Sequence, residues 1–397
     1  MRVSTENRDA PRSTLHEETW GIGLGDLDAG AKMRGTWTRT KMLAVVVGLM
    51  ACDHGAGSKD SGSATEDSGT ATEDSGTATE DSGTATEDSG TATEDSGTAD
   101  ESCVEQAQAP LSWEEATALE SQFVYQGVDE PIALVLMFHG GGGSMEDHFE
   151  RVDPARITAE ALRRGMAVAS LNSVAHLDPD AGNELQWEEG PIGSNPDLDE
   201  TLEMIRKLSS ADELDVVPEG TPIVLIGTSN GGSMASRVAQ IPSLQVAVTA
   251  IYISNAQAFH ESGAVWPPMV LIPGAQDPGL AQETNTQLSE RIDDPSEALL
   301  VVNPAEPVTD ALLTRVAGID CELGMTIIEG MTASGWLDDA AMLSADPSAD
   351  RSWADSLPTE AMAARPQLQD LLTEAYAGHA PSGDQNEIVF EFLESHL

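Results

Sequence analysis

The sequence predicts an α/β domain over residues 103–397, built on a mostly parallel sheet with helices on both faces. Three observations lead to this prediction. Continuous apolar runs of strand length recur along the segment, and apolar runs without alternation are typical of strands buried on both faces. Segments with helical spacing of apolar residues separate these runs. Two glycine-rich turns directly follow two of the runs, at the carboxyl ends of strands, where α/β sheets place their chemistry.

Residues 1–52 are predicted to be an N-terminal extension followed by an export signal. Met42–Met50 is a nine-residue apolar run preceded by basic residues, as in a signal peptide, and it is too short to span a bilayer. The run leads into Cys52 through a motif that resembles the bacterial lipoprotein lipobox, and this resemblance implies lipidation of Cys52. An ordinary signal peptide with an incidental cysteine is the alternative. We expect translation to start at Met33.

Residues 53–102 are predicted to be a disordered acidic linker. The heptapeptide Ala64–Thr70 recurs four more times without change, and none of its positions carries a large apolar side chain. Such a segment cannot bury enough surface to offset the entropy of ordering it, so we expect an extended, self-repelling tether. Together with a lipid anchor, the tether would hold the following domain away from the cell envelope.

The charge of the chain excludes some classes of function. The whole sequence has a net charge of −49, and residues 103–397 contain 48 acidic and 11 basic residues, a net charge of −37. A nucleic-acid binder needs a basic face, and docking on anionic lipid needs a polybasic surface. We therefore expect neither. Acidity of this degree indicates a saline habitat or, equally well, a lineage-wide acidic composition.

The individual elements follow from the apolar pattern. Strands are expected at Pro131–Phe138, Ala167–Leu171, Pro222–Ile226, Val246–Ile253, Met269–Ile272 and Ala298–Val302. Helices are expected between them at Pro154–Arg164, Asp197–Leu208, Ser233–Gln240 and Thr284–Ile292, and an amphipathic helix at Asn386–His396 closes the chain. The alternation of the two element types predicts a doubly wound sheet.

The turn Gly227–Gly231 provides the strongest chemical signal. It has the pattern G-x-S-x-G between an expected strand and an expected helix. In such a nucleophile elbow the backbone reverses so tightly that larger flanking side chains would clash. The turn predicts Ser229 as a nucleophile and the N–H of Asn230, at a helix N-terminus, as an oxyanion donor. A purely structural glycine turn is the alternative.

The turn after the first expected strand, Phe138–Ser144, contains a histidine followed by four glycines. It matches the HGGG-type loop that supplies a second oxyanion donor through a backbone N–H. Gly140 and Gly141 are the candidate donors, because glycine lets the backbone approach a substrate carbonyl closely. A phosphate-binding loop is disfavoured because no Gly-Lys-Ser/Thr follows. We expect His139 to hold the loop in place.

These residues make the segment 120–397 resemble the α/β-hydrolase superfamily, in particular its serine esterase and depolymerase-like members. The triad of that family runs in the order serine, acid, histidine. The resemblance implies Asp277, which follows a strand and a glycine, as the acid, and His379, ahead of the final helix, as the base. With Ser229 they would form a Ser-Asp-His triad. We expect no cofactor and no metal, since no dinucleotide-binding fingerprint appears and no histidine–cysteine cluster has zinc-binding spacing.

The connection between Asp277 and His379 is longer than is common in this family. Residues 303–375 contain three segments with helical spacing, at Thr309–Val316, Cys321–Ser334 and Thr359–Tyr376. We expect a helical insertion that covers the site as a cap, with a lateral decoration as the alternative. Because of this insertion, His148, His176 and His260 remain alternative bases, and Asp384 an alternative acid.

Two cysteines and two tryptophans complete the set of candidate residues. An exported domain lies in an oxidising compartment, so Cys103 and Cys321 are candidates for a disulfide that joins the start of the domain to the insertion; two free thiols are the alternative. Trp187 and Trp266 would line the substrate pocket or simply pack in the core.

These features predict an exported, lipid-anchored serine hydrolase, most simply a carboxylic ester hydrolase working through an acyl-enzyme. Its partners would be a small or polymeric ester and, through the anchor only, a bacterial cell-envelope membrane; we expect a monomer. A serine peptidase of the same superfamily and a catalytically inactive surface binding protein are the alternatives.

Overall fold

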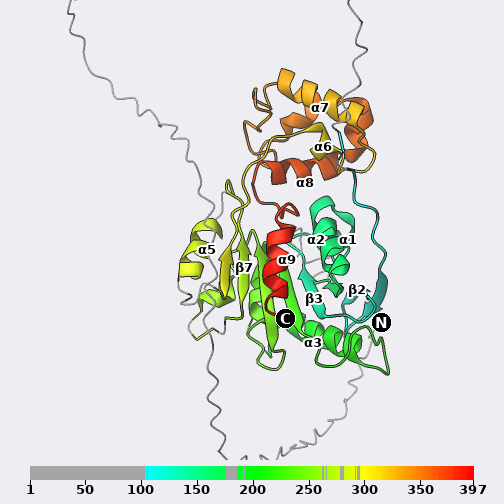
Figure 1. The fold of residues 1–397 in the computed structure, drawn as a ribbon, viewed down its shortest axis with the longest axis vertical. Helices are drawn as coiled ribbons and strands as arrows, with labels where there is room; N and C mark the ends of the chain where they lie inside the picture. Colours follow the sequence, from blue (N-terminus) through cyan, green and yellow to red (C-terminus); the bar gives the residue numbers. More distant parts are fainter. Residues whose placement is uncertain are drawn as a thin grey trace, which may run out of the picture. The chain divides into compact units, whose positions relative to one another are not determined.

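The computed structural model describes residues 103–397 except 105, 175–185, 189, 191–192, 262, 265, 278–280, 291 and 293–295. The signal segment, Cys52 and the repeat linker lie outside the described residues, as does His176. The described chain forms a twisted sheet flanked by helices, with a group of helices from 303–375 beyond one end of the strands (Figure 1).

Within the described residues, eight strands form a single sheet in the order β1-β2-β4-β3-β5-β6-β7-β8. They are β1 (Glu114–Thr117), β2 (Gln122–Gln126), β3 (Ala133–Phe138), β4 (Met166–Leu171), β5 (Ile223–Thr228), β6 (Val246–Tyr252), β7 (Met269–Ile272) and β8 (Ala298–Leu300). β1 and β2 pair antiparallel with their neighbours, and all the other pairs are parallel. This mixed sheet with helices on both faces is the α/β-hydrolase fold, so the predicted fold class is confirmed.

The helices cover both faces of the sheet. They are α1 (Asp147–Glu150), α2 (Val152–Arg163), α3 (Pro196–Ser209), α4 (Asn230–Val238), η2 (Gln257–His260), α5 (Ala281–Glu290), α6 (Asp310–Leu313), α7 (Cys321–Ala333), η3 (Arg351–Ser356), η4 (Thr359–Ala364), α8 (Arg365–Ala375) and α9 (Asn386–Glu394), where η marks a 3-10 helix. Side chains of α3, α4 and α5 pack in the hydrophobic cluster on one face, and those of α1, α2 and α9 in the cluster on the other.

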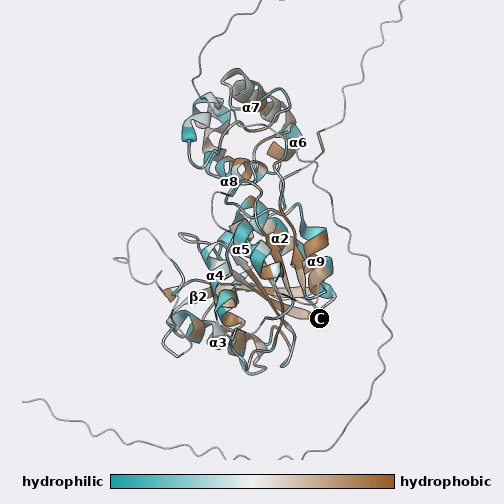
Figure 2. Ribbon diagram, turned by 90° about the vertical axis from the view of Figure 1, so that its left-hand side faces the viewer, coloured by the Kyte–Doolittle hydropathy of each residue, from teal (hydrophilic) through white to brown (hydrophobic). Residues whose placement is uncertain are grey.

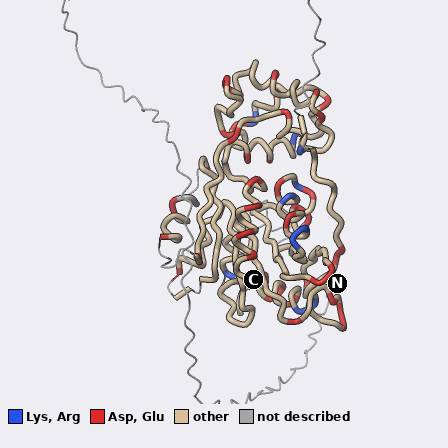
Figure 3. Tube along the Cα trace, in the orientation of Figure 1, with Lys and Arg blue, Asp and Glu red and all other residues tan. Residues whose placement is uncertain are grey.

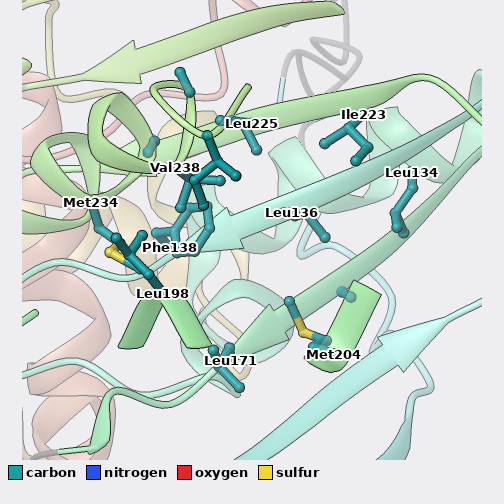
Figure 4. Packing of buried hydrophobic residues seen from close by; sticks show 14 of the residues in the cluster. Leu134, Leu136, Phe138, Leu171, Leu198, Met204, Ile223, Leu225, Met234 and Val238 are labelled. Carbon is teal, nitrogen blue, oxygen red and sulfur yellow. The ribbon is translucent and has the colours of Figure 1, made fainter. Parts of the chain in front are cut away.

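The period of two along each strand divides the core between these faces. In β3, Leu134, Leu136 and Phe138 point to the face covered by α3 and α4, while Val135 and Met137 point to the opposite face. Figure 4 shows the first set of side chains packed with those from the neighbouring strands and helices. Because both faces are buried, the strands are hydrophobic throughout, and they form the largely brown layer of Figure 2.

Several elements differ from the expected ones: α1, η2 and η3 were not expected, and α5 begins three residues before the expected helix. The edge strand β1 and its neighbour β2 were not expected, because β1 has no apolar run and β2 is placed by its antiparallel pairing with β4. Helix α4 begins at Asn230, three residues earlier than expected, since its glycine-rich first turn conceals the helical pattern. The segment 359–376 is two helices, η4 and α8, and Pro366 stands in the first turn of α8.

The insertion 303–375 has a hydrophobic core of its own. Residues of α6, α7, η3, η4 and α8 form a separate buried cluster around Trp353, which also takes in Val152 from α2. Cys103 and Cys321 form a disulfide with an S–S distance of 2.12 Å, which joins the start of the described chain to the first turn of α7. The start of the α/β domain is therefore covalently attached to the insertion.

Candidate active site

Ser229 lies in the sharp turn between β5 and α4, with backbone angles of φ 53° and ψ −121°. Such a positive φ is costly for a residue other than glycine, and it persists only where the surroundings enforce it. The Ser229 N–H donates to the Tyr252 carbonyl at 2.9 Å. A Cβ atom on Gly231 would lie 2.1 Å from the Phe138 carbonyl oxygen, and one on Gly227 would lie 2.3 Å from that of Gly231. The elbow therefore requires both of its flanking glycines.

The side chains of Ser229, His379 and Asp277 form one continuous relay. His379 Nε2 lies 2.7 Å from Ser229 Oγ, and His379 Nδ1 lies 3.0 Å from Asp277 Oδ2. The Asp277 side chain is 1% exposed and that of His379 is 47% exposed. An ionised carboxylate can only accept, so Nδ1–H donates to Asp277 and Nε2 is left to accept the serine proton. The structure thus brings together the three residues that the resemblance implied.

Close packing of two loops aligns the acid with the histidine. Gly274 follows β7, and a Cβ atom there would lie 2.3 Å from the Ala377 carbonyl oxygen and 2.5 Å from that of Gly378. The same Ala377 carbonyl accepts a 2.9 Å hydrogen bond from the Gln276 N–H. Because the loops touch through their backbones one residue before Asp277 and two before His379, the two side chains reach each other although they are 102 residues apart.

Backbone donors lie next to the serine. Asn230 is the first residue of α4, and the first N–H groups of a helix have no partner within it. Gly140 lines a cavity that opens over Ser229, and a Cβ atom on it would lie 3.4 Å from Ser229 Cβ. Gly141 also lines the cavity. These are the three residues expected to hold an oxyanion.

Trp187 ties the two donor loops together. Its indole N–H donates to the His139 carbonyl at 2.8 Å, and its backbone N–H donates to the Asn230 side chain at 2.6 Å. Its ring is 3% exposed and packs against the His139 ring at a centroid distance of 4.6 Å. Trp187 therefore packs beneath the site and positions both loops, a role that sequence analysis could not assign because it depends on contacts across the fold. Trp266 donates to the Phe259 carbonyl at 2.9 Å.

The alternative bases and the alternative acid lie in other environments. His148 is buried in α1, and burial, His139 and Arg151 lower its pKa to about 3. His260 ends η2. Burial alone would raise the pKa of Asp384, but ion pairs with Arg315 and Arg156, both at 2.7 Å, outweigh it and lower that pKa. Asp384 thus links the insertion to α2.

A cavity of about 300 Å³ opens over the serine. The core contributes Ser229, His379 and the glycine loop to its lining, and the insertion contributes Ser348, Gln369 and Thr373 among others. The insertion therefore lies over the carboxyl ends of the strands, and it is called the cap below.

Charged side chains border the cavity on both sides. Arg151 of the core pairs with Asp370 of the cap at 2.7 Å and with Asp147 at 3.4 Å. Arg351 of the cap also lines the cavity. In the part of the chain that the structure describes, no three His, Cys, Asp or Glu side chains are grouped so that they could hold a metal ion.

Comparison with solved structures finds α/β-hydrolases at low identity. An esterase from Pyrococcus furiosus is 14% identical with a TM-score of 0.37, and the match covers 51% of this chain and 88% of that one. A dienelactone hydrolase from Anabaena variabilis is 15% identical with a TM-score of 0.37, covering 56% and 96%. An esterase from Butyrivibrio proteoclasticus with ferulic acid bound is 15% identical with a TM-score of 0.36, covering 49% and 90%. No family model and no curated protein matches the chain. The assignment of the fold therefore rests on the strand order of this chain and on its sharp turn at Ser229.

Proposed function

We propose that this chain is a serine hydrolase that cleaves carboxylic esters through an acyl-enzyme. The observation that supports this most strongly is the relay from buried Asp277 through His379 to Ser229, with Ser229 at the N-terminus of α4. A nucleophile, a base in contact with it and a group that orients the base are the components that acyl transfer requires. Backbone donors beside the nucleophile supply the fourth component.

Acylation begins when Ser229 Oγ attacks the ester carbonyl carbon and His379 Nε2 takes the hydroxyl proton. The carbonyl electrons move to oxygen, and the N–H groups of Asn230 and of Gly140 or Gly141 stabilise the resulting oxyanion. Collapse of this tetrahedral species breaks the ester C–O bond. His379 returns its proton to the leaving oxygen, which departs as the alcohol, while Asp277 stabilises the transient imidazolium.

Deacylation repeats these steps with water as the nucleophile. His379 takes a proton from the water as its oxygen bonds to the acyl carbon, and the proton then passes to Ser229 Oγ as the acyl bond breaks. The products are the carboxylic acid and the free enzyme.

A fluorophosphonate probe tests the nucleophile. We expect covalent labelling of the wild-type chain and no labelling of Ser229→Ala. Ser348→Ala is the matched control, because Ser348 borders the same cavity but donates its hydroxyl to Asp346 at 2.7 Å, so this variant should be labelled normally. Folded wild-type protein that takes up no label would overturn the proposal and support an inactive binding protein.

The same relay would also serve amide cleavage, so a serine peptidase is the second candidate function. A para-nitrophenyl ester and the para-nitroanilide of the same acyl group separate the two. We expect turnover of the ester and at most trace turnover of the anilide. Faster turnover of the anilide would favour the peptidase.

We further propose that the chain is exported and anchored by lipid at Cys52, with the repeat linker as a tether. What supports this is the apolar run before Cys52 and the acidic repeats after it. Within the described residues, none of the helices has the length and apolar character needed to cross a bilayer. We expect Cys52→Ser to move the protein from the membrane fraction to the soluble fraction of cells; an unchanged distribution would contradict the anchor.

A further inference from the structure

Arg351 differs from most basic residues of this strongly acidic domain in that it forms no ion pair. Of the lysine and arginine side chains that the structure describes, only those of Arg351 and Arg365 form no ion pair; all the others do. Figure 3 shows how few basic residues lie among the acidic ones. Arg351 lines the cavity over Ser229, whereas Arg365 is not among the lining residues. Of these two unpaired cations, Arg351 is therefore the one at the candidate active site.

Four acidic side chains near Arg351, in sequence or in the cavity, are engaged elsewhere, and no ion pair joins Arg351 to Asp355 of the same short helix. The Asp350 carboxylate accepts from the Ser352 N–H at 2.9 Å and caps η3. Asp346 accepts from the N–H and the hydroxyl of Ser348 at 2.8 and 2.7 Å. Asp370 and Asp147, which share the cavity with Arg351, both pair with Arg151. The guanidinium of Arg351 is thus left to solvent or to a ligand.

The backbone around Arg351 is held firmly. Trp353, in the same short helix η3, is fully buried in the core of the cap. Its indole N–H lies 3.3 Å from both the Pro347 carbonyl and the Gln369 side-chain oxygen. Gln369 also lines the cavity. The cap therefore presents Arg351 to the cavity from a rigid base, as a specificity group requires.

We propose that Arg351 binds an anionic group of the substrate, so that the esters this chain prefers carry a carboxylate or a similar anion beside the scissile bond. A planar guanidinium with five donors suits a carboxylate. The polar lining from Ser348, Gln369 and Thr373 suits such a substrate better than a long acyl chain. Repulsion by the acidic domain is screened beyond about 8 Å at physiological salt, so a direct contact with Arg351 persists. This inference rests on the proposed ester hydrolysis at Ser229.

Two pairs of esters test the proposal, each pair differing in one charge. Mono-para-nitrophenyl glutarate and para-nitrophenyl pentanoate place the difference on the acyl side, and meta-acetoxybenzoate and meta-acetoxybenzamide place it on the alcohol side. Ser229→Ala supplies the blank for spontaneous hydrolysis. The wild-type chain should prefer the anionic member of at least one pair by about tenfold in kcat/KM, mainly through KM, as one partly exposed charged hydrogen bond would give.

The variants decide whether Arg351 causes that preference. Arg351→Gln should abolish it while the neutral esters are cleaved as before, and Arg351→Lys should restore part of it. Arg365→Gln removes the other unpaired cation of the cap and should retain the full preference. Equal turnover within both pairs, or a preference that survives in Arg351→Gln, would overturn the inference alone. If no ester is cleaved and Ser229 takes up no fluorophosphonate, the proposed function fails and the inference fails with it.

Discussion

At the residue scale, the site depends on positions where the backbone conformation or close packing restricts which residue can stand there. Ser229 occupies a backbone conformation with positive φ, and Gly231 lies against the chain of the neighbouring turn. Strain of this kind costs about 1–3 kcal/mol and is retained where surrounding contacts impose it. Here those contacts include the Ser229 N–H bond to Tyr252 and the packing of the two glycine turns. As a result, the hydroxyl lies at the cavity and within hydrogen-bond distance of His379.

Asp277→Asn should disturb the orientation of His379 without disturbing the folding of the chain. The amide keeps the shape of the carboxylate but favours the wrong tautomer of His379, so we expect kcat to fall by about 10⁴ while the melting temperature changes little. Ester turnover and thermal denaturation measure the two effects. Asp384→Asn is the control: it breaks the pairs with Arg156 and Arg315, so it should lower the free energy of unfolding by about 3 kcal/mol and leave kcat within a small factor. If instead Asp384→Asn lowered kcat and Asp277→Asn did not, Asp384 would be the acid of the triad.

Gly274→Ala should disturb catalysis through the backbone. The added methyl would meet the carbonyl oxygens of Ala377 and Gly378 at 2.3 and 2.5 Å and push the histidine loop away. A displacement of about 1 Å can cost 100-fold in rate, so we expect a loss of that order in kcat. Gly324→Ala in α7, whose added methyl would make contacts of 3.4 Å, should leave kcat unchanged. Wild-type kcat in Gly274→Ala would refute the packing argument.

At the scale of elements, a buried charge cluster joins the cap to the core. Asp153 and Arg156 come from α2, Arg315 from the cap after α6, and Asp384 from the loop before α9. Glu374, near the end of α8, is buried beside them, and its side chain lies 3.8 Å from Arg315. Burial first, and then the charge of Asp153, raise the pKa of Glu374 well above its usual value. When Glu374 is protonated, the remaining charges of the cluster are two carboxylates and two guanidinium groups, which balance.

This cluster makes the stability of the domain depend on pH. The unfolded chain releases the Glu374 proton near pH 4.3, whereas the folded chain keeps it to higher pH. The unfolded state therefore binds fewer protons in that window, and the free energy of unfolding falls as pH rises from the unfolded pKa towards the folded one. Glu374→Gln should flatten this slope and be more stable than the wild type at the upper end. Chemical denaturation at several pH values measures it.

Glu360→Gln provides the control for that experiment. Glu360 is an exposed glutamate of the same cap, so removing its charge should leave the slope as in the wild type. A Glu374→Gln variant with the wild-type slope would show that Glu374 is ionised in the folded chain.

At the scale of the whole molecule, the acidity belongs to the folded domain more than to the linker. Residues 103–397 have a net charge of −37 out of −49. Like charges on a compact surface repel one another, and salt screens that repulsion. We expect the melting temperature to hold or rise between about 0.1 and 1 M salt, equally in NaCl and KCl, with turnover of a neutral ester retained. A steady fall of both would mean that surface ion pairs outweigh the repulsion.

The sequence by itself determined the elements whose signals are local. Uninterrupted apolar runs indicated six strands, because a strand buried on both faces cannot alternate. The turn around Ser229 could be recognised from the sequence because such a tight reversal of the chain requires small residues at fixed spacing. Strands β1 and β2 were missed, since β1 has no apolar run and β2 is placed by its pairing with the distant strand β4.

Only the tertiary structure decided how distant parts meet. The contacts of His379 with Asp277 and Ser229, the role of Trp187 between two loops and the position of the cap over the cavity all join segments that lie far apart in the sequence. Spacing along the chain does not encode these contacts, because they depend on which loops pack at one end of the sheet. For the same reason the sequence placed Arg351 only in a helical insertion, and the fold placed it at the cavity.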